Sequence, residues 1–143
     1  MTKILVVDDE DLLRRVLKTA LEQEGFVVDT AENGVAALQC MADDPADLVL
    51  TDIIMPDKEG IELILTLRKL YSEARIIAMT GGGRLGPKDL LGVAERFGAD
   101  SALSKPFALD ALVALIRRLD PNAPAEASDE VPEPDRRAQG KGN

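Results

Sequence analysis

The sequence contains no histidine, no tryptophan and only one cysteine. The absence of histidine excludes catalysis by a Ser-His-Asp triad and most zinc sites. The single Cys40 cannot form an internal disulfide, and we interpret it as a small apolar residue on a helix, because no histidine is present to activate it. This cysteine usage is typical of a reducing compartment, so we predict a cytoplasmic location.

Positive charge and long apolar runs are also scarce. The chain has 17 Lys and Arg residues against 26 Asp and Glu residues, which gives a net charge of −9. Binding to bare nucleic acid needs clustered positive charge, so we expect no DNA binding. No apolar run approaches the ~20 residues of a membrane span. The first residues also lack the pattern of a signal peptide, and we expect no membrane association.

The residues that are present suit one aliphatic core. The chain has 143 residues, of which 45% are hydrophobic and only 3% aromatic. From Asp120 onward, prolines interrupt a stretch rich in Ala, Glu, Asp, Ser and Gly. Such a stretch buries too little apolar surface to offset its ordering entropy. We predict a folded domain over residues 1–120 and a disordered, acidic, proline-rich tail over residues 121–143.

Short apolar runs alternate with segments of helical spacing, which predicts an α/β fold. Alternation of this kind is typical of a parallel sheet with helices on both faces. Strands are predicted at residues 4–7, 26–28, 48–52, 75–79 and 101–104, with a turn at 29–33. Helices are predicted at residues 10–24, 34–41, 60–71, 87–97 and 108–119, and their expected inward faces include Val16, Val35, Leu70 and Leu109.

Polar side chains follow four of the five predicted strands. Asp8 and Asp9 follow the first strand, Asp52 ends the third, and Thr80 and Lys105 follow the fourth and fifth. Right-handed crossovers bring the carboxyl ends of parallel strands to one edge of the sheet, where open α/β sheets place their chemistry. The sequence therefore predicts that these five residues meet at one rim.

This set of residue types favours phosphoryl transfer assisted by Mg²⁺. Crowded carboxylates repel each other, and a hard divalent cation with oxygen ligands removes that repulsion. We assign Asp8 and Asp9 to metal binding and Asp52 to the nucleophile of an aspartyl-phosphate. Thr80, Lys105 and nearby glycine amides would neutralise the phosphoryl group. Taken singly, each residue has a simpler interpretation, as a helix cap, a loop lysine or a strand threonine.

The chain resembles the receiver domains of response regulators, the phosphoacceptor modules of two-component signalling. The matching motifs are ILVVDDE at 4–10, LTDIIMPDKEG at 50–60, MTG at 79–81, GAD at 98–100 and KPF at 105–107. The resemblance covers about residues 3–119. It implies a flavodoxin-like fold with five parallel strands in the order 2-1-3-4-5, an order carried over from that family.

The resemblance also implies roles for individual residues. Asp52 would accept a phosphoryl group from a sensor histidine kinase or a histidine phosphotransfer protein. Asp9, Asp52 and the backbone carbonyl of Ile54 would hold Mg²⁺, with Asp8 acting through water. Thr80 and Lys105 would bind the phosphoryl group. The Lys105–Pro106 peptide bond is expected to be cis.

Two departures from the family pattern concern the switch that follows phosphorylation. The family usually has an aromatic residue three positions before the lysine, and this chain has Ala102 there. The 25 residues from Thr80 to Lys105 are a longer separation than is usual, and the extra length lies in the loop at Gly81, Gly82 and Gly83. One hypothesis is that this loop reorders on phosphorylation. Alanine at 82 and 83 would then change partner binding but not phosphorylation. The alternative is a plain loop insertion.

The leading functional prediction is a stand-alone receiver in a phosphorelay, a monomer or weak dimer that acts through protein contacts. It is not a classical enzyme, because it catalyses only its own phosphorylation and dephosphorylation. One alternative is an adaptor that is never phosphorylated. Another is an Asp-dependent phosphatase, although that class carries a second Asp where this chain has Ile54. A third is a fragment of a longer regulator, with the tail as a linker.

Ile54, beside the predicted phosphorylation site, is expected to hinder the water that attacks the aspartyl-phosphate and so to lengthen the lifetime of the phosphoryl group. The rate of dephosphorylation of an Ile54→Asn variant would test that expectation.

Overall fold

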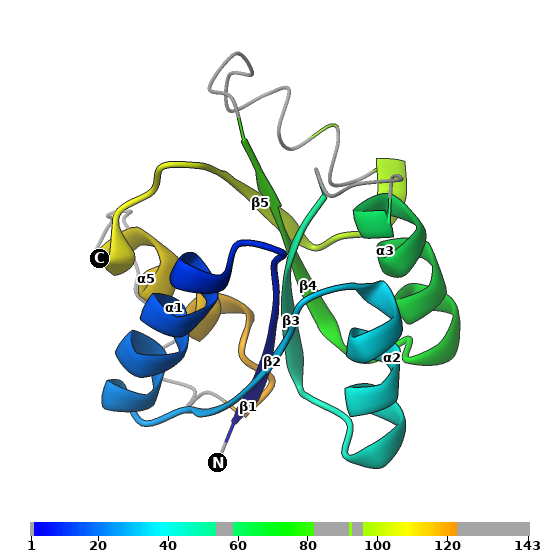
Figure 1. Cartoon of the computed structure of the whole chain (residues 1–143), viewed down its shortest axis with the longest axis horizontal. Helices are drawn as coiled ribbons and strands as arrows, with labels where there is room; N and C mark the ends of the chain where they lie inside the picture. The colour runs from blue at the N-terminus through cyan, green and yellow to red at the C-terminus, as the bar shows by residue number, and fades with distance from the viewer. Residues whose placement is uncertain (1, 54–58, 82–91, 93–95, 123–143) are drawn as a thin grey trace, which may run out of the picture.

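The computed structural model of the protein describes residues 2–53, 59–81, 92 and 96–122. Within these residues, five parallel strands form one sheet with two helices on each face (Figure 1). The strands are β1 (Lys3–Val7), β2 (Val27–Ala31), β3 (Leu48–Asp52), β4 (Arg75–Thr80) and β5 (Ser101–Ser104). The helices are α1 (Asp11–Gln23), α2 (Gly34–Asp43), α3 (Glu59–Leu70) and α5 (Leu109–Leu119).

The strand order is β2-β1-β3-β4-β5, which confirms the predicted flavodoxin-like arrangement. β3 lies in the middle of the sheet, and all five of its residues are buried. Its sequence suits this place, because a continuous run of Leu and Val can be buried on both faces of a parallel sheet. The carboxyl end of this strand carries Asp52, so the candidate nucleophile lies at the centre of one edge.

Alternate residues of the strands feed two separate hydrophobic clusters. Ile4 and Val6 of β1 pack toward α1 and α5, whereas Leu5 and Val7 pack toward α2 and α3. The period of two in a strand places successive side chains on opposite faces of the sheet. The sheet therefore has one aliphatic layer on each side, and its helices are held by apolar contacts on both faces.

The second strand is longer than predicted. The predicted turn at residues 29–33 is wrong, because β2 runs from Val27 to Ala31 and pairs with β1 along its whole length. β2 is an edge strand, and the side chain of Asp29 can therefore lie in solvent without interrupting the ladder. The predicted strand stops at residue 28 because the polar residues Asp29 and Thr30 are typical of a turn. Asn33 then caps α2, where its side chain accepts a hydrogen bond of 2.8 Å from the amide of Ala36.

Four predicted inward residues are instead exposed. The exposed fractions are 53% for Val16, 74% for Val35, 61% for Leu70 and 40% for Leu109. Each residue lies at the flank or end of its helix, where the apolar stripe is wider than the surface that the sheet covers. Helical spacing predicts which face turns inward, but it does not predict how far the sheet extends beneath it.

Parts of two predictions lie outside the described residues. The predicted fourth helix is described only at Gly92, Arg96 and Phe97, which are helical. Of the predicted tail, only Pro121 and Asn122 are described, directly after α5 and Asp120. The division into a domain over 1–120 and a tail over 121–143 stays a prediction.

Candidate functional site

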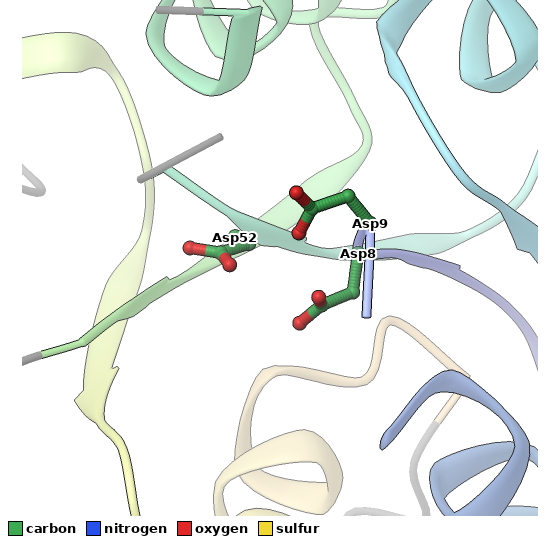
Figure 2. Close-up of side chains that lie close together, drawn as sticks. All are labelled: Asp8, Asp9 and Asp52. Carbon is green, nitrogen blue, oxygen red and sulfur yellow. The ribbon is translucent and has the colours of Figure 1, made fainter. Parts of the chain in front are cut away.

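Three carboxylates meet where β1 and β3 end. Val7 pairs with Thr51 in the sheet, which brings the next residues, Asp8 and Asp52, to the same level of the edge. One carboxylate oxygen from each of Asp8, Asp9 and Asp52 lies within 4.8 Å of the others (Figure 2). Asp8 and Asp52 are buried, with exposed fractions of 0% and 5%, whereas Asp9 is exposed to solvent. The group is thus closed on the protein side and open on the solvent side.

The amide, the carbonyl and both carboxylate oxygens of Asp8 each form a hydrogen bond. Its amide donates to the carbonyl of Ala31 at 3.1 Å, which extends the β1–β2 ladder by one residue. Its Oδ1 accepts a hydrogen bond of 2.8 Å from the amide of Glu10, and its carbonyl accepts one of 2.7 Å from Nη1 of Arg14. Its Oδ2 accepts a hydrogen bond of 2.7 Å from Nζ of Lys105. Asp8 is therefore a rigid anchor beneath the site.

Lys105 joins two of the carboxylates. Its Nζ lies 2.7 Å from Oδ2 of Asp8 and 3.0 Å from Oδ2 of Asp52. Burial alone would lower the pKa of Lys105, but its hydrogen bonds and the charges of both carboxylates outweigh burial and raise that pKa. The side chain is therefore charged at neutral pH. Its backbone amide donates to the carbonyl of Thr80 at 2.7 Å, and the Lys105–Pro106 peptide bond is cis.

The backbone of Asp52 is also closely packed. The next amide, of Ile53, donates to the carbonyl of Met79 at 3.0 Å. A Cβ atom built on Gly60 would lie 2.3 Å from the carbonyl oxygen of Asp52 and 2.4 Å from Cα of Ile53. Only a residue without a side chain permits this approach. Gly60 therefore lets the start of α3 lie directly against the peptide that carries Asp52.

The charges at this edge suit a hard divalent cation. Three carboxylates and one ammonium group have a formal net charge of −2, and every atom that the three carboxylates offer to a metal is an oxygen. Mg²⁺ prefers oxygen ligands, keeps several waters and needs only one or two protein carboxylates. The exposed Asp9 and the open solvent side leave room for such waters. The donor set therefore fits Mg²⁺.

The structure brings together four of the predicted site residues, namely Asp8, Asp9, Asp52 and Lys105. Thr80 lies at the same edge, is 2% exposed, and follows Met79, the residue that pairs with Asp52. Ile54, Gly82 and Gly83 lie outside the described residues. Gly81 is half-buried, and a Cβ atom built on it would have no other atom of the described residues within 4 Å, so a larger residue would fit there. Ala102 is half-buried against the core cluster on the α2 and α3 side.

Sequence reasoning missed the contact made by Arg14 and the close approach at Gly60. Glycine at 60 belongs to a recognised motif, but its packing partner is eight residues away and can be identified only in the folded chain. Arg14 lies one helical turn after Glu10, a spacing that by itself suggests only a solvent-exposed helix residue. The half-buried Cys40 lies on α2, as interpreted, and burial raises the pKa of its thiol.

Comparison with known proteins identifies relatives over most of the chain. The family described as "Response regulator receiver domain" matches residues 4–117. The chain is 39% identical to the DNA-binding transcriptional regulator NtrC of Azospirillum brasilense, over 87% of this chain and 25% of that protein. It is 36% identical to the chemotaxis protein CheY of Halobacterium salinarum, over 73% of this chain and 85% of that protein. The chain thus spans about a quarter of the first relative and most of the second.

Solved structures give the same match. The response regulator protein TrrA of Thermotoga maritima, solved in complex with Mg(2+)-BeF, superimposes with a TM-score of 0.72. The two chains are 37% identical, and the match covers 83% of this chain and 99% of that one. In the part of the chain that the structure describes, no helix combines the length and apolar character needed to cross a membrane.

Proposed function

The chain belongs to the response regulator receiver family, and from this premise we propose that Asp52 is its phosphoacceptor. The observation that supports this assignment is the pairing of buried Asp52 with Lys105, beside the carboxylates of Asp8 and Asp9. Asp52 is the carboxylate at the end of the central strand, and the packing of Gly60 against its peptide fixes its position. Each carboxylate oxygen of Asp8 already accepts a hydrogen bond, and Asp9 is exposed.

The proposed reaction transfers a phosphoryl group from a phosphohistidine to Asp52. One carboxylate oxygen of Asp52 attacks phosphorus, the bond from phosphorus to the imidazole nitrogen breaks, and the imidazole departs and takes a proton. Lys105 is already 3.0 Å from Asp52, so its ammonium group can follow the negative charge from the carboxylate to the phosphoryl oxygens. Thr80, at the neighbouring strand end, is proposed to donate its hydroxyl to the same group.

Asp8, Asp9 and Asp52 are proposed to hold Mg²⁺, together with the backbone carbonyl of Ile54, which lies outside the described residues. When bound, the metal would supply charge neutralisation for the carboxylates and for the incoming phosphoryl oxygens. Asp8 is tied to Lys105 and Glu10, which favours an indirect role through water. Asp9 points toward the other two carboxylates, and within the described residues no hydrogen bond or ion pair engages its own carboxylate, which favours direct binding.

The proposed phosphodonor is a sensor histidine kinase or a histidine phosphotransfer protein, and the proposed output is contact with a partner protein. NtrC is named as a DNA-binding regulator, but this chain spans only a quarter of its length. DNA binding is therefore not part of the proposal. Turnover of small phosphate esters is not expected either, because the reaction ends on a side chain of the protein itself.

Labelling of the full chain by acetyl phosphate, followed by intact-mass measurement, tests the assignment. With Mg²⁺, the wild type should gain one phosphoryl group, and the gain should be lost in EDTA and in Asp52→Asn. The chain contains no histidine, so a label cannot be a phosphohistidine of its own. Asp44→Asn is the matched control, because Asp44 also pairs with a lysine but lies at the opposite end of the sheet.

Each outcome decides between functions. Labelling that persists in Asp52→Asn would place the phosphoryl group on another residue. No labelling of the wild type under any condition would favour an adaptor that is never phosphorylated. Steady release of phosphate from small phosphate esters, in large excess over the protein, would favour a phosphatase. Loss of labelling in Asp44→Asn would show that the assay reports general damage to the fold.

A further inference from the structure

We propose that Arg14 of α1 positions Asp9 for metal binding, by holding the carbonyl of Asp8 and thereby the peptide that leads into Asp9. The inference rests on the proposed Mg²⁺ site and assigns it a further residue. Within the described residues, Arg14 does not contact the carboxylate of any proposed metal ligand; it contacts the backbone carbonyl of Asp8. It is a positioning residue, whose effect reaches the metal through the backbone.

The contacts of Arg14 are specific and shielded. Its Nη1 donates to the carbonyl of Asp8 at 2.7 Å, and its Nη2 pairs with Oδ1 of Asp11. Only 13% of the Arg14 side chain is exposed, which is unusual for an arginine on an outer helix. The planar guanidinium presents its donors in a fixed fork, so these two contacts define its orientation. The fork ties the start of α1 to the end of β1.

The carbonyl of Asp8 and the amide of Asp9 belong to one planar peptide unit. Holding that carbonyl therefore restricts the direction in which Asp9 leaves the strand. The preceding peptide is already fixed, because the amide of Asp8 donates to Ala31. The following one is fixed by the amide of Glu10, which donates to Oδ1 of Asp8. Arg14 supplies the remaining restraint between these two points.

Asp9 depends on its backbone more than the other two carboxylates do. Asp8 and Asp52 are buried and paired with Lys105. Asp9 is exposed, and within the described residues no hydrogen bond or ion pair holds its carboxylate. Its direction toward the other two, visible in Figure 2, is therefore set by the peptide that carries it. A looser peptide would spread Asp9 over more orientations and raise the entropy cost of metal binding.

The charge of Arg14 and its positioning contact predict opposite changes in Mg²⁺ affinity when the side chain is removed. A cation beside a Mg²⁺ site repels the metal, so removal of its charge alone would strengthen Mg²⁺ binding. Loss of the positioning contact would instead weaken it. The direction of the change therefore separates the two explanations without any need for a precise magnitude.

Arg15 offers a matched control on the next residue of the same helix. It carries the same charge and pairs with the same carboxylate, with Nη2 3.1 Å from Oδ2 of Asp11. Its side chain is 77% exposed, and within the described residues its guanidinium pairs with Asp11 and not with Asp8. Arg15→Ala thus removes a cation and a partner of Asp11 but leaves the carbonyl of Asp8 untouched.

The test measures Mg²⁺ dissociation constants of the full chain by calorimetric titration, with amide NMR shifts as a second reading. We expect Arg14→Ala to bind Mg²⁺ about 10-fold more weakly, the size seen when an outer-shell partner of a metal ligand is lost. Arg14→Lys, which keeps the charge but not the fork, should also bind more weakly. Arg15→Ala should remain within about 2-fold of the wild type. Thermal unfolding in EDTA verifies that each variant is folded at the titration temperature.

Equal or tighter Mg²⁺ binding by both Arg14 variants would overturn the proposal. A loss in Arg15→Ala as large as that in Arg14→Ala would also overturn it, because the cause would then be Asp11. If Arg14→Ala does not fold, Arg14→Lys decides the question. Absence of Mg²⁺ binding by the wild type would instead refute the proposed metal site, which is a different and recognisable result.

Discussion

Both ends of the sheet hold one lysine between two aspartates, yet the two arrangements differ in burial. Around Lys105, at the carboxyl edge, the side chains of the carboxylate partners are 1% and 7% exposed, whereas around Lys3, which begins β1, they are 50% and 78% exposed. The partners are Asp8 and Asp52 for Lys105, and Asp29 and Asp44 for Lys3. The two lysine side chains are similarly shielded, with exposed fractions of 14% for Lys3 and 20% for Lys105. The difference therefore lies in the carboxylates, which are exposed around one lysine and buried around the other.

Three other carboxylates near the amino edge bind the backbone or a hydroxyl group and so connect segments that are distant in the sequence. Asp47 accepts from the amide of Lys3 at 2.9 Å. Asp100 accepts from the amide of Ile76 at 2.8 Å and pairs with Arg68. Asp120 accepts from the hydroxyl of Thr2, which ties the end of α5 to the start of the chain. Each of these carboxylates has a structural partner.

At the carboxyl edge, the carboxylates outnumber the positively charged groups that pair with them. One ammonium group pairs with the two buried carboxylates, and the third carboxylate, of Asp9, has no ion pair within the described residues. Buried charge without full compensation costs free energy of folding, and such charge is typical of functional sites. The comparison teaches that the two edges use similar residues for different purposes. The amino edge stabilises the fold, and the carboxyl edge gathers the charge on which the proposed binding of a metal and a phosphoryl group depends.

The largest expected effect concerns a glycine at each edge. Gly60→Ala would place a methyl group onto the peptide of Asp52, and we expect a loss of about 3 kcal/mol in the free energy of unfolding. Gly25, at the turn before β2, has a φ of 100° but no atom within 4 Å of a Cβ position. Gly25→Ala should cost only about 1 kcal/mol, from backbone strain. Urea denaturation of both variants measures the difference.

Phosphoryl uptake, measured by the labelling assay, is a second way to compare Gly60→Ala with Gly25→Ala. Gly60→Ala should also lose phosphoryl uptake, because the peptide that carries Asp52 must move, whereas Gly25→Ala should keep it. Equal stabilities of the two variants, together with normal labelling of Gly60→Ala, would show that α3 shifts without disturbing the site.

A smaller effect is expected from replacing each lysine by methionine. Lys105→Met leaves two buried carboxylates without their cation, and we expect a loss of about 2 kcal/mol in EDTA. Lys3→Met should cost less than about 1 kcal/mol, because its carboxylate partners remain hydrated. Added Mg²⁺ should restore part of the loss in Lys105→Met only. Similar losses in the two variants, with no response to Mg²⁺, would contradict the contrast between the edges.

The smallest effect is expected at alkaline pH. For both lysines, burial alone would lower the pKa, but hydrogen bonds and nearby carboxylates raise it above the ordinary value. A raised pKa in the folded state contributes stability that is fully present below the unfolded pKa of about 10.4 and is lost as pH rises through the folded pKa. The wild type should therefore lose stability above about pH 10.4.

Each lysine variant should show a flatter stability profile in that range. Added salt should screen the contribution of Lys3 more than that of Lys105, because its partners are exposed. Urea denaturation from pH 9 upward, at two salt concentrations, measures both. A profile of Lys105→Met that matches the wild type would show that the buried pair does not shift the pKa of the lysine.

The sequence by itself determined the α/β class, the strand order through its family resemblance, and the edge at which the polar residues gather. Those features depend on local signals, because apolar runs, periods of two and 3.6, and motif order can all be read along the chain. Burial of β3 and the position of Asp52 at its end follow directly. Local signals failed at β2, where edge position allowed polar residues within a strand.

Only the tertiary structure decided which of these groups touch. Lys105 binds Asp8 across 97 residues of chain and contacts it at least as closely as it contacts Asp52. Gly60 packs on the peptide of Asp52, and Arg14 holds the carbonyl of Asp8. Such contacts depend on the helices and strands meeting in three dimensions at separations that no sequence period encodes. The sequence therefore indicates where charge collects, and the packing of the folded chain determines how that charge is held.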